Sequence, residues 1–272
     1  MSKLQGRAIA ITGAGSGIGQ ALARELAKRG CDLALCDVNE AGLEDTARSI
    51  HGRKVTTAVV DVANRESVET WAKESIDAHG TIDGIVNNAG VTVQDTINDI
   101  SYEDFEWIVG INLWGVVYGT KSFLPHLIAR DTGWVVNISS VFGMVGFPGQ
   151  GSYNATKFAV RGMTEALRLE LEGTGVTACS VHPGGIRTNI VRNGRLHRDP
   201  TGRIDPKDMA DRFETMAKTT PEQAAKVIAN GMEKREPRIL IGPDAHAIDA
   251  IARVAPRRYG KLMAKLVDVL DR

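Results

Sequence analysis

A tyrosine and a lysine stand four positions apart in the stretch GSYNATKFAVRG, residues 151–162. Positions four apart on a helix share one face, so Tyr153 and Lys157 can point into the same cleft. A free tyrosine has a pKa of about 10 and is a poor base, but a neighbouring ammonium group favours the phenolate and lowers that pKa. The pair therefore predicts an acid–base centre that donates a proton to a carbonyl oxygen or accepts one from an alcohol. The alternative is an ordinary solvated helix face.

Three further polar residues are candidates for the same chemistry. Ser139 and Ser140 follow an apolar, strand-like run, and a hydroxyl there can bond a substrate oxygen on which charge develops. A serine pair after a strand is also a common helix cap. Asn112 lies within a helical pattern, where asparagine has a low intrinsic propensity. Its amide therefore needs either a chemical role or a buried backbone group to satisfy.

A glycine-rich stretch, TGAGSGIG at 12–19, joins the first strand-like run to a helical pattern. Gly13 permits a tight turn, Gly17 lets the backbone approach a pyrophosphate, and Gly19 lets the helix pack close to the sheet. The helix N-terminus adds free N–H groups and a partial positive charge. The stretch predicts a dinucleotide-binding loop, with a glycine turn that binds nothing as the alternative.

Acidic residues end the second and third strand-like runs. Asp37 stands where a carboxylate meets the adenosine ribose in dinucleotide-binding folds, and it would repel a 2′-phosphate. Ser16, Val38 and Asn39 supply no cation for such a phosphate, so we expect NAD, with NADP less favoured. Asp37 capping the next helix is the alternative. For Asp61, a bond to the adenine amino group and a loop cap are about equally supported.

Short apolar runs alternate with helical patterns along the chain. The predicted strands are 8–12, 32–37, 56–61, 84–90, 134–139, 177–184 and 238–242. The predicted helices are 18–29, 40–50, 65–79, 103–130, 153–173 and 221–235. The spacing is too long for hairpins and fits crossover helices. We therefore expect an α/β fold of the Rossmann type, with a doubly wound parallel sheet of about seven strands and helices on both faces. A single domain over 1–272 is expected.

The composition excludes several classes of function. The 272 residues carry a formal net charge of zero, from 33 basic and 33 acidic side chains, which gives no electrostatic case for nucleic acid. No apolar run reaches the ~18 residues of a membrane span, and the N-terminus does not read as a signal peptide. Cys31, Cys36 and Cys179 lie in strand-like runs without metal-ligand spacing. We expect reduced thiols, a cytoplasmic protein and no metal site.

Taken together, the motifs resemble those of the short-chain dehydrogenase/reductase family. The matches, in the family's order, are TGAGSGIG, Asp61, NNAG at 87–90, Asn112, Ser140, Tyr153-x-x-x-Lys157 and PGGIRT at 183–188. They span residues 6–190. The resemblance implies an NAD-dependent alcohol dehydrogenase or carbonyl reductase. Its spacing selects Ser140 over Ser139.

The resemblance also assigns expected roles. It implies that Lys157 holds the nicotinamide ribose hydroxyls and that Asn112 steadies a water in a proton relay. It puts the Ile186 backbone and the Thr188 hydroxyl on the carboxamide, whereas we take His182 as structural. The expected catalytic residues are Asn112, Ser140, Tyr153 and Lys157. The expected cofactor residues are Gly13, Ser16, Gly17, Ile18, Gly19, Asp37, Asp61, Val62, Asn88, Ala89, Gly90, Tyr153, Lys157, Pro183, Gly184, Ile186 and Thr188.

Apolar residues near this edge suit a lipophilic alcohol or ketone. They are Val91, Val93, Val141, Phe142, Met144, Val145 and Phe147. The alternative is that they form the core of a lid. The segment 187–220 interrupts the alternation and is expected to be that lid. Its arginines either meet an acidic substrate or solvate the lid, and they are Arg187, Arg192, Arg195, Arg198 and Arg203.

The tail at 246–272 has apolar residues at helical intervals among basic ones. Contact with a partner subunit is favoured over a membrane surface, because Pro256 and Gly260 divide the pattern. The resemblance implies a homodimer or homotetramer through the helices 103–130 and 153–173. The rival function is a catalytically silent nucleotide-sensing protein, against which the four intact catalytic residues argue.

Overall fold

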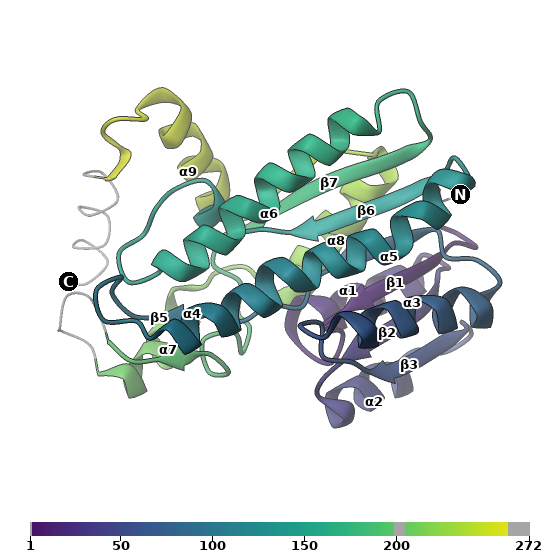
Figure 1. The fold of residues 1–272 in the computed structure, drawn as a ribbon, viewed down its shortest axis with the longest axis horizontal. Coiled ribbons are helices and arrows are strands. Elements are labelled where there is room, and N and C mark those ends of the chain that lie inside the picture. The colour runs from purple at the N-terminus through teal and green to yellow at the C-terminus, as the bar shows by residue number, and fades with distance from the viewer. Residues whose placement is uncertain (1, 199–204, 261–272) are drawn as a thin grey trace.

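The computed structural model describes residues 2–198 and 205–260, which include a seven-stranded sheet (Figure 1). The strands of this sheet are β1 (Ala8–Thr12), β2 (Asp32–Asp37), β3 (Val55–Val59), β4 (Gly84–Asn87), β6 (Gly133–Ile138), β7 (Val176–Pro183) and β9 (Arg238–Ile241). Their order is β3-β2-β1-β4-β6-β7-β9, and every neighbouring pair is parallel. The order reverses between β1 and β4, where ligands bind in doubly wound sheets. The expected fold class is confirmed.

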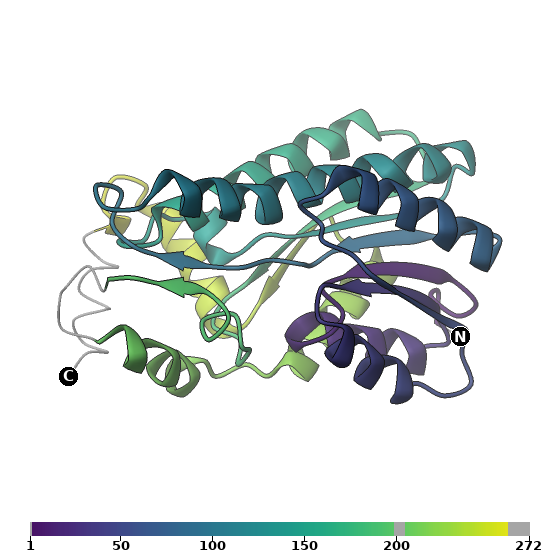
Figure 2. The same ribbon diagram turned by 60° about the horizontal axis from the view of Figure 1, so that its bottom comes forward.

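Helices cover both faces of the sheet, which Figure 2 shows as two layers with the strands between them. One layer holds α1 (Gly17–Lys28), α2 (Glu40–Arg48) and α8 (Pro221–Lys234). The other holds α3 (Arg65–His79), α5 (Gly115–Ala129) and α6 (Gly151–Glu170). Because side chains alternate along a strand, Ile9 and Ile11 of β1 pack under the first layer, and Ala8 and Ala10 under the second. Apolar residues on both faces explain the nearly unbroken apolar runs.

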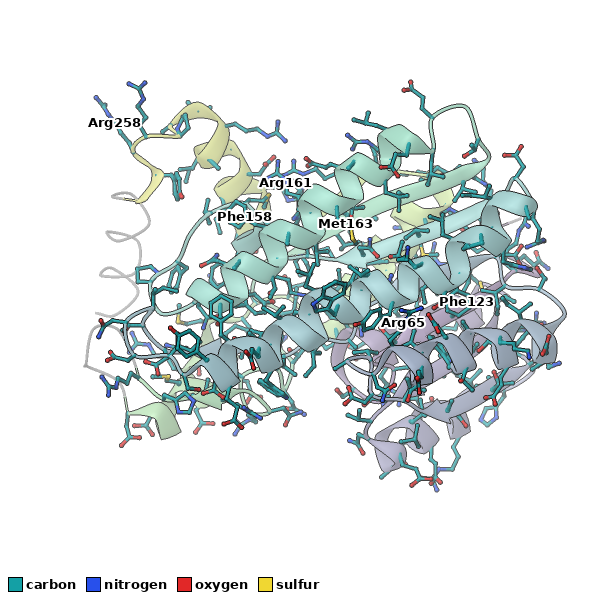
Figure 3. The ribbon with its side chains drawn as sticks, viewed as in Figure 1. Arg65, Phe123, Phe158, Arg161, Met163 and Arg258 are labelled. Carbon is teal, nitrogen blue, oxygen red and sulfur yellow. The ribbon has the colours of Figure 1, made fainter. Side chains whose placement is uncertain are left out.

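The second layer is held by large aromatic side chains as well as by aliphatic ones. Phe123 of α5 is fully buried and meets Trp71 of α3 edge to face, with 5.4 Å between ring centroids (Figure 3). Such a pair stabilises the contact beyond the area it buries. The contact packs α3 against α5.

The predicted helix 103–130 is divided into three parts. α4 (Tyr102–Val109) and α5 are joined by a π-helical turn, η1 (Gly110–Trp114), which contains Asn112. A π turn carries one extra residue and is frequent at functional sites. Sequence periodicity gave no sign of it, because the apolar pattern continues through the turn.

The expected lid at 187–220 and the expected tail at 246–272 both contain regular secondary structure. β8 (Arg195–Leu196) pairs in parallel with β5 (Val93–Gln94), and α7 (Pro206–Met216) follows, all but β5 within the expected lid 187–220. The final described helix, α9 (Pro243–Val254), begins three residues before the predicted tail. Residues 261–272 of that tail and Arg203 of the lid lie outside the described residues.

Along residues 2–198 and 205–260, none of the helices combines the length and the apolar character that crossing a membrane requires. Cys31, Cys36 and Cys179 are buried free thiols, as expected. Burial raises the pKa of the Cys31 and Cys179 thiols to about 12, so neither is a reactive thiolate at neutral pH.

Candidate active site

Tyr153, Lys157 and Ser140 converge at the carboxyl edge of the sheet. α6 begins at Gly151, so Tyr153 lies in its first turn and Lys157 one turn later. Lys157 Nζ lies 5.5 Å from the centroid of the Tyr153 ring and donates a hydrogen bond of 3.0 Å to the carbonyl of Ile138, the last residue of β6. The Ser140 hydroxyl is a hydrogen-bond partner of the phenol. Tyr153 and Lys157 therefore do not form a solvated helix face, since Lys157 is only 3% exposed.

The protonation of this pair differs from the expectation. Burial raises the pKa of Tyr153 to about 12, and the bond from Ser140 only partly opposes that rise. Burial also lowers the pKa of Lys157 to about 8. The expected lowering of the tyrosine pKa is absent because loss of hydration on burial dominates, and the bond from Ser140 is the one effect that opposes it. At neutral pH the phenol carries its proton.

The two serines are used differently. Ser139 Oγ donates to the carbonyl of Lys157 at 2.8 Å, which ties the end of β6 to α6. Ser140 Oγ accepts from Phe142 N–H at 3.1 Å and caps the short helix η2 (Val141–Gly143). Since its oxygen already accepts a bond, the Ser140 hydroxyl hydrogen can be directed to another acceptor. Ser140 can therefore cap η2 with its oxygen and still donate its hydroxyl hydrogen to a substrate.

Asn112 is fully buried in the π turn and holds the backbone of Val91, the residue that follows NNAG. Its Oδ1 accepts from Val91 N–H at 2.8 Å, and its Nδ2 donates to Val91 C=O at 2.9 Å. A Cβ on Gly90 would lie 3.3 Å from Asn112 Oδ1 and 3.4 Å from Lys157 Nζ, so Gly90 separates the two side chains. The Asn112 amide therefore satisfies the N–H and C=O groups of Val91, which is the backbone role considered as the alternative to a proton relay.

The glycine loop is built for close backbone approach. Gly13 has φ +66°, and a Cβ on Gly19 would lie 2.1 Å from the Gly13 carbonyl oxygen. Asn88 Nδ2 donates to the carbonyls of Thr12 and Gly13 at 2.9 and 3.1 Å, and so braces the loop from β4. Thr12 completes the brace by accepting from the N–H groups of Asn88 and Ala89. Thr12 was not singled out from the sequence.

The first turn of α1 fits an anionic ligand. Asn39 and Asn64 cap α2 and α3 through their side chains, yet within the described residues the Ser16 side chain caps none of the N–H groups of α1. Serine is a preferred cap, so uncapped N–H groups here are available to another acceptor. A helix N-terminus of this kind suits a phosphate group. Ile18 lies in the same turn.

Asp37 and Asp61 take different parts in their loops. Asp37 accepts from Gly15 N–H at 2.8 Å and from Asn39 N–H at 2.9 Å. It links β2 to the glycine loop, and the cap of α2 is Asn39, so the cap alternative for Asp37 is wrong. Asp61 accepts from Ala63 N–H at 2.9 Å, which is the loop cap considered for it. Val62, beside it, is buried.

The segment after β7 returns to the glycine loop. A Cβ on Gly17 would lie 3.2 Å from the Thr188 side chain, which brings the end of this segment against α1. Ile186 is bridged to Thr219, though the bond of 3.0 Å to the Thr219 carbonyl uses Arg187 N–H. Asp244, a residue that sequence reasoning missed, accepts from Gly185 N–H at 2.7 Å.

The Asp244 carboxylate also explains why residue 184 is a glycine. A Cβ on Gly184 would lie 2.1 Å from Asp244 Oδ2, so a side chain there would displace Asp244. Pro183, the last residue of β7, is buried and starts the turn. The expected residues after β7 are therefore held by α9 as well as by the sheet.

The apolar residues near Tyr153 divide into two groups. Phe142 stacks on Phe147 with 4.9 Å between ring centroids and meets Tyr153 edge to face at 6.2 Å. Val141, Met144 and Val145 instead pack on Ala245 and Ile248 of α9, a helix outside the expected lid 187–220. Val93 is fully buried within β5.

Asn154, another residue missed from the sequence, holds the segment between Ser140 and Tyr153. Its amide donates to the carbonyls of Phe142 and Val145 at 2.7 and 2.8 Å, and its Oδ1 accepts from Phe147 N–H. This polar residue follows Tyr153 directly in sequence. Asn154 therefore holds both the turn that carries Tyr153 and the segment with Phe142 and Phe147 beside it.

Three arginines of the expected lid are paired with acidic side chains, and two of them, Arg192 and Arg198, remain largely exposed to solvent, which agrees with the solvation alternative. Arg195 bonds Asp104 at 2.6 Å and lies 4.0 Å over the Trp107 ring, and His197 Nε2 lies 2.7 Å from the same carboxylate. We call Asp104, Trp107, Arg195 and His197 the latch. Arg192 and Arg198 make ion pairs of their own with acidic side chains.

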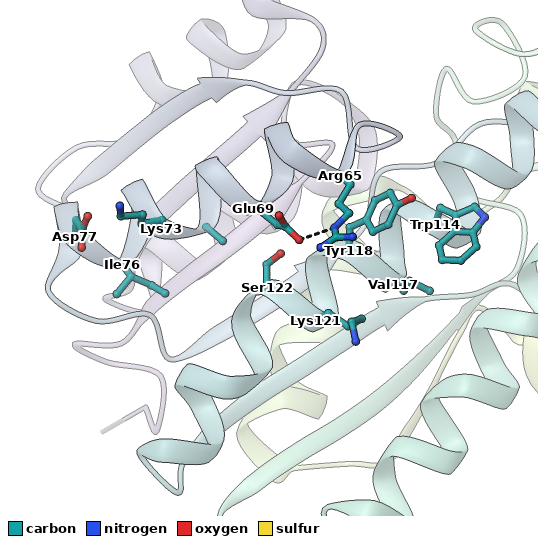
Figure 4. A pocket seen from close by; sticks show the side chains of 11 residues that line it. Arg65, Glu69, Lys73, Ile76, Asp77, Trp114, Val117, Tyr118, Lys121 and Ser122 are labelled. Atoms are coloured by element: carbon teal, nitrogen blue, oxygen red, sulfur yellow. Dashed lines mark hydrogen bonds and ion pairs between the residues drawn. The ribbon is translucent and has the colours of Figure 1, made fainter.

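A groove of about 610 Å³ lies between α3 and α5 and contains none of the expected site residues (Figure 4). Trp114 and Tyr118 stack there, with 5.6 Å between ring centroids, beside an ion pair between Arg65 and Glu69. Among the described residues there is no group of three or more His, Cys, Asp or Glu side chains that could hold a metal ion.

Comparison with known proteins is consistent across sequence and structure. The family model described as short chain dehydrogenase matches residues 7–199. SadH of Mycobacterium tuberculosis is 43% identical over 269 residues, covering 97% of this chain and 96% of that protein. The 3-oxoacyl-acyl-carrier-protein reductase FabG of Thermotoga maritima is 34% identical over 218 residues, covering 76% of this chain and 89% of that protein. A short chain dehydrogenase/reductase from Burkholderia phymatum, solved in complex with NAD, has a TM-score of 0.85 and 28% identity, covering 97% of each chain.

Proposed function

The chain belongs to the short-chain dehydrogenase family, and on that premise we propose that it transfers a hydride between NAD(H) and a lipophilic secondary alcohol or its ketone. Family membership makes it an oxidoreductase that acts on CH–OH or carbonyl groups. The observation that carries the proposal is the convergence of Ser140, Tyr153 and Lys157 at the carboxyl edge of β6. The catalytically silent alternative has no need of that arrangement.

In the reducing direction Tyr153 acts as the general acid. Its pKa of about 12 keeps the proton on the phenol at neutral pH, and the phenol gives that proton to the carbonyl oxygen as negative charge develops there. Ser140 donates its hydroxyl hydrogen to the same oxygen while its Oγ accepts from Phe142 N–H. A protonated Lys157 stabilises the phenolate that remains. Asn112 holds Val91, the residue after Gly90, which lies between Asn112 and Lys157, and we propose that it steadies a water that returns the proton.

The cofactor would lie along the glycine loop and the segment after β7. When bound, its nicotinamide supplies the hydride for reduction or accepts one during oxidation. Gly13, Gly17 and Gly19 leave room for the pyrophosphate at the uncapped end of α1. Asp37 would accept from the ribose hydroxyls and repel a 2′-phosphate, which supports NAD over NADP. The Burkholderia phymatum relative in complex with NAD supports the same assignment.

We propose the apolar character of the substrate from the stacked rings of Phe142 and Phe147 beside Tyr153. Phe142 and Phe147 stack beside Tyr153 and bring no charged group to it. Three of the lid arginines, Arg192, Arg195 and Arg198, are paired with acidic side chains of the protein itself. A neutral, lipophilic ketone therefore fits these surroundings better than an acid.

The proposal extends to assembly and location. We propose a homodimer or homotetramer and a cytoplasmic protein, the latter supported by the free thiols. Association through α5 and α6 is supported by the exposed apolar side chains on these helices.

The test follows the absorbance of reduced nicotinamide while a panel of alcohols and ketones is scanned with NAD and with NADH. We expect turnover of lipophilic secondary alcohols or ketones, and a loss of roughly 10³-fold or more in kcat for Tyr153→Phe. If the parent and the variant both bind NAD without turning over any member of the panel, the silent alternative is correct.

A further inference from the structure

His182 lies beside Ser140, although the two residues are far apart in sequence. It is the residue before Pro183 in β7, and its side chain is completely buried. Its Nδ1 lies 3.0 Å from the Ser140 carbonyl oxygen, and its Nε2 lies 3.1 Å from Ser180 Oγ. Both ring nitrogens are therefore paired inside the protein.

The partners decide which nitrogen carries the proton. A carbonyl oxygen can only accept, so Nδ1 is the donor to Ser140. Nε2 then accepts from the Ser180 hydroxyl, which is also buried. Burial lowers the pKa of His182 to about 4, despite the opposing effect of the bond to Ser140. The ring is thus a neutral donor of fixed direction at neutral pH and exchanges no proton with a substrate.

We propose that His182 is a positioning residue that sets the direction of the Ser140 hydroxyl by holding the Ser140 carbonyl. That carbonyl also accepts from Gly143 N–H at 3.0 Å, so two donors fix its peptide plane. The Ser140 side chain leaves the same residue, whose φ of −169° and ψ of 168° are fully extended. Loss of one donor frees the Ser140–Val141 peptide to rotate, which displaces the Phe142 N–H that holds the Ser140 hydroxyl oxygen.

The position of His182 in sequence adds to its effect. Pro183, which follows it, starts the segment that returns to the glycine loop at Thr188. One rigid residue thereby connects the serine expected to bind the substrate oxygen with the segment expected to hold the nicotinamide. The inference rests on the proposed role of Ser140.

Two substitutions separate positioning from simple packing. The amide nitrogen of asparagine is as far from Cβ as Nδ1 of histidine, and that of glutamine is as far as Nε2. His182→Asn therefore keeps a donor to the Ser140 carbonyl, and His182→Gln removes it. We expect His182→Asn to stay within about threefold of the parent kcat, and His182→Gln to fall roughly 10- to 100-fold, with the KM for NAD the same in both.

A readout without turnover keeps this test separate from the proposed function. In crystal structures of the two variants, we expect Ser140 Oγ to stay within about 0.5 Å of its place in His182→Asn and to move farther in His182→Gln. His126→Gln is the control, because His126 bonds Ile82 N–H at the amino end of β4, away from the site. It is expected to alter thermal stability and to leave kcat as in the parent.

Thermal unfolding shows whether each variant is folded at the assay temperature. If kcat falls equally in both variants, or falls in neither, or Ser140 Oγ keeps its place in His182→Gln, the positioning role is wrong. If no variant and no parent turns over any substrate, the proposed function fails, while the position of Ser140 Oγ still decides the role of His182.

Discussion

At the scale of single residues, burial and charge act against each other in Lys157. The side chain is 3% exposed, and its Nζ is bonded to one backbone carbonyl, that of Ile138. Taking an ammonium group out of water disfavours its charged form, which is why its pKa falls from 10.5 to about 8. A side chain that costs stability at neutral pH is retained where it serves the chemistry.

The cost predicts how stability depends on pH. The folded pKa of Lys157 is lower than the unfolded one, so between about pH 8 and 10.5 the unfolded chain binds more protons and this group makes stability rise with pH. At pH 7 we expect Lys157→Met to be more stable than the parent, by an amount of the order of 3 kcal/mol. Urea denaturation should show that difference shrinking as the pH rises to about 10. A difference that does not change with pH would contradict the account.

Asp37 gives a second prediction at this scale, on the choice of cofactor. Replacing Asp37 with serine removes the negative charge that repels a 2′-phosphate, so kcat/KM for NADP should rise relative to NAD by roughly tenfold or more. Asp61→Asn is the matched control, since it removes a carboxylate from the neighbouring strand end. It should change kcat/KM for the two cofactors alike. An unchanged ratio in Asp37→Ser would remove the basis for assigning NAD.

At the scale of elements, the π turn and the latch belong to one circuit of contacts. Asn112 in η1 holds Val91, two residues before β5, and β5 pairs with β8. Arg195 of β8 is bonded to Asp104 of α4, which leads directly back into η1. β8, in the expected lid, is therefore linked to η1 by two routes, through β5 and Val91 and through Asp104 of α4.

We predict that Asp104→Asn loosens this lid. Burial raises the pKa of Asp104, but the bonds from Arg195 and His197 outweigh it and leave the pKa below its ordinary value. The charged carboxylate therefore contributes stability that is lost as the pH falls through the lowered pKa. We expect the KM for the substrate to rise roughly fivefold with the KM for NAD unchanged, and trypsin to cleave faster within residues 187–198.

Arg192→Gln is the control for the latch. Arg192 is paired with Asp211 and Glu214 on the surface, where ion pairs contribute ~0–1 kcal/mol, so kinetics and proteolysis should stay close to those of the parent. Equal effects of the two substitutions would mean that Asp104 has no special part in closing the lid.

At the scale of the whole molecule, the layer containing α5 and α6 carries several large apolar side chains on its outer surface. Phe158 is 41% and Leu169 66% exposed, and Gly162 has open space around it, all on one face of α6. Figure 3 shows Phe158, Arg161 and Met163 along the same helix. On α5 the exposed apolar side chains include Ile128. Large exposed apolar residues gathered on a face indicate an interface.

We therefore predict that Phe158→Asp weakens self-association. A symmetric interface brings the same residue from both copies together, so one substitution places two charges in it. Light scattering coupled to gel filtration should give a dimer or tetramer for the parent and a smaller mass for the variant. Val59→Asp, which changes an exposed residue at the edge strand β3, should leave the mass unchanged. A parent that elutes as a single chain would contradict the prediction.

The sequence by itself determined the fold class, the glycine loop and the pairing of Tyr153 with Lys157. These depend on periodicity and on short spacings, which are local properties of the chain. The tertiary structure alone decided that Ser139 is bonded to the Lys157 carbonyl while Ser140 meets the phenol, that Asn112 lies in a π turn and that Arg195 bonds Asp104. It also decided the protonation of Tyr153 and the partners of His182. Hydrogen-bond partners and burial come from residues distant in sequence, and no local pattern records them.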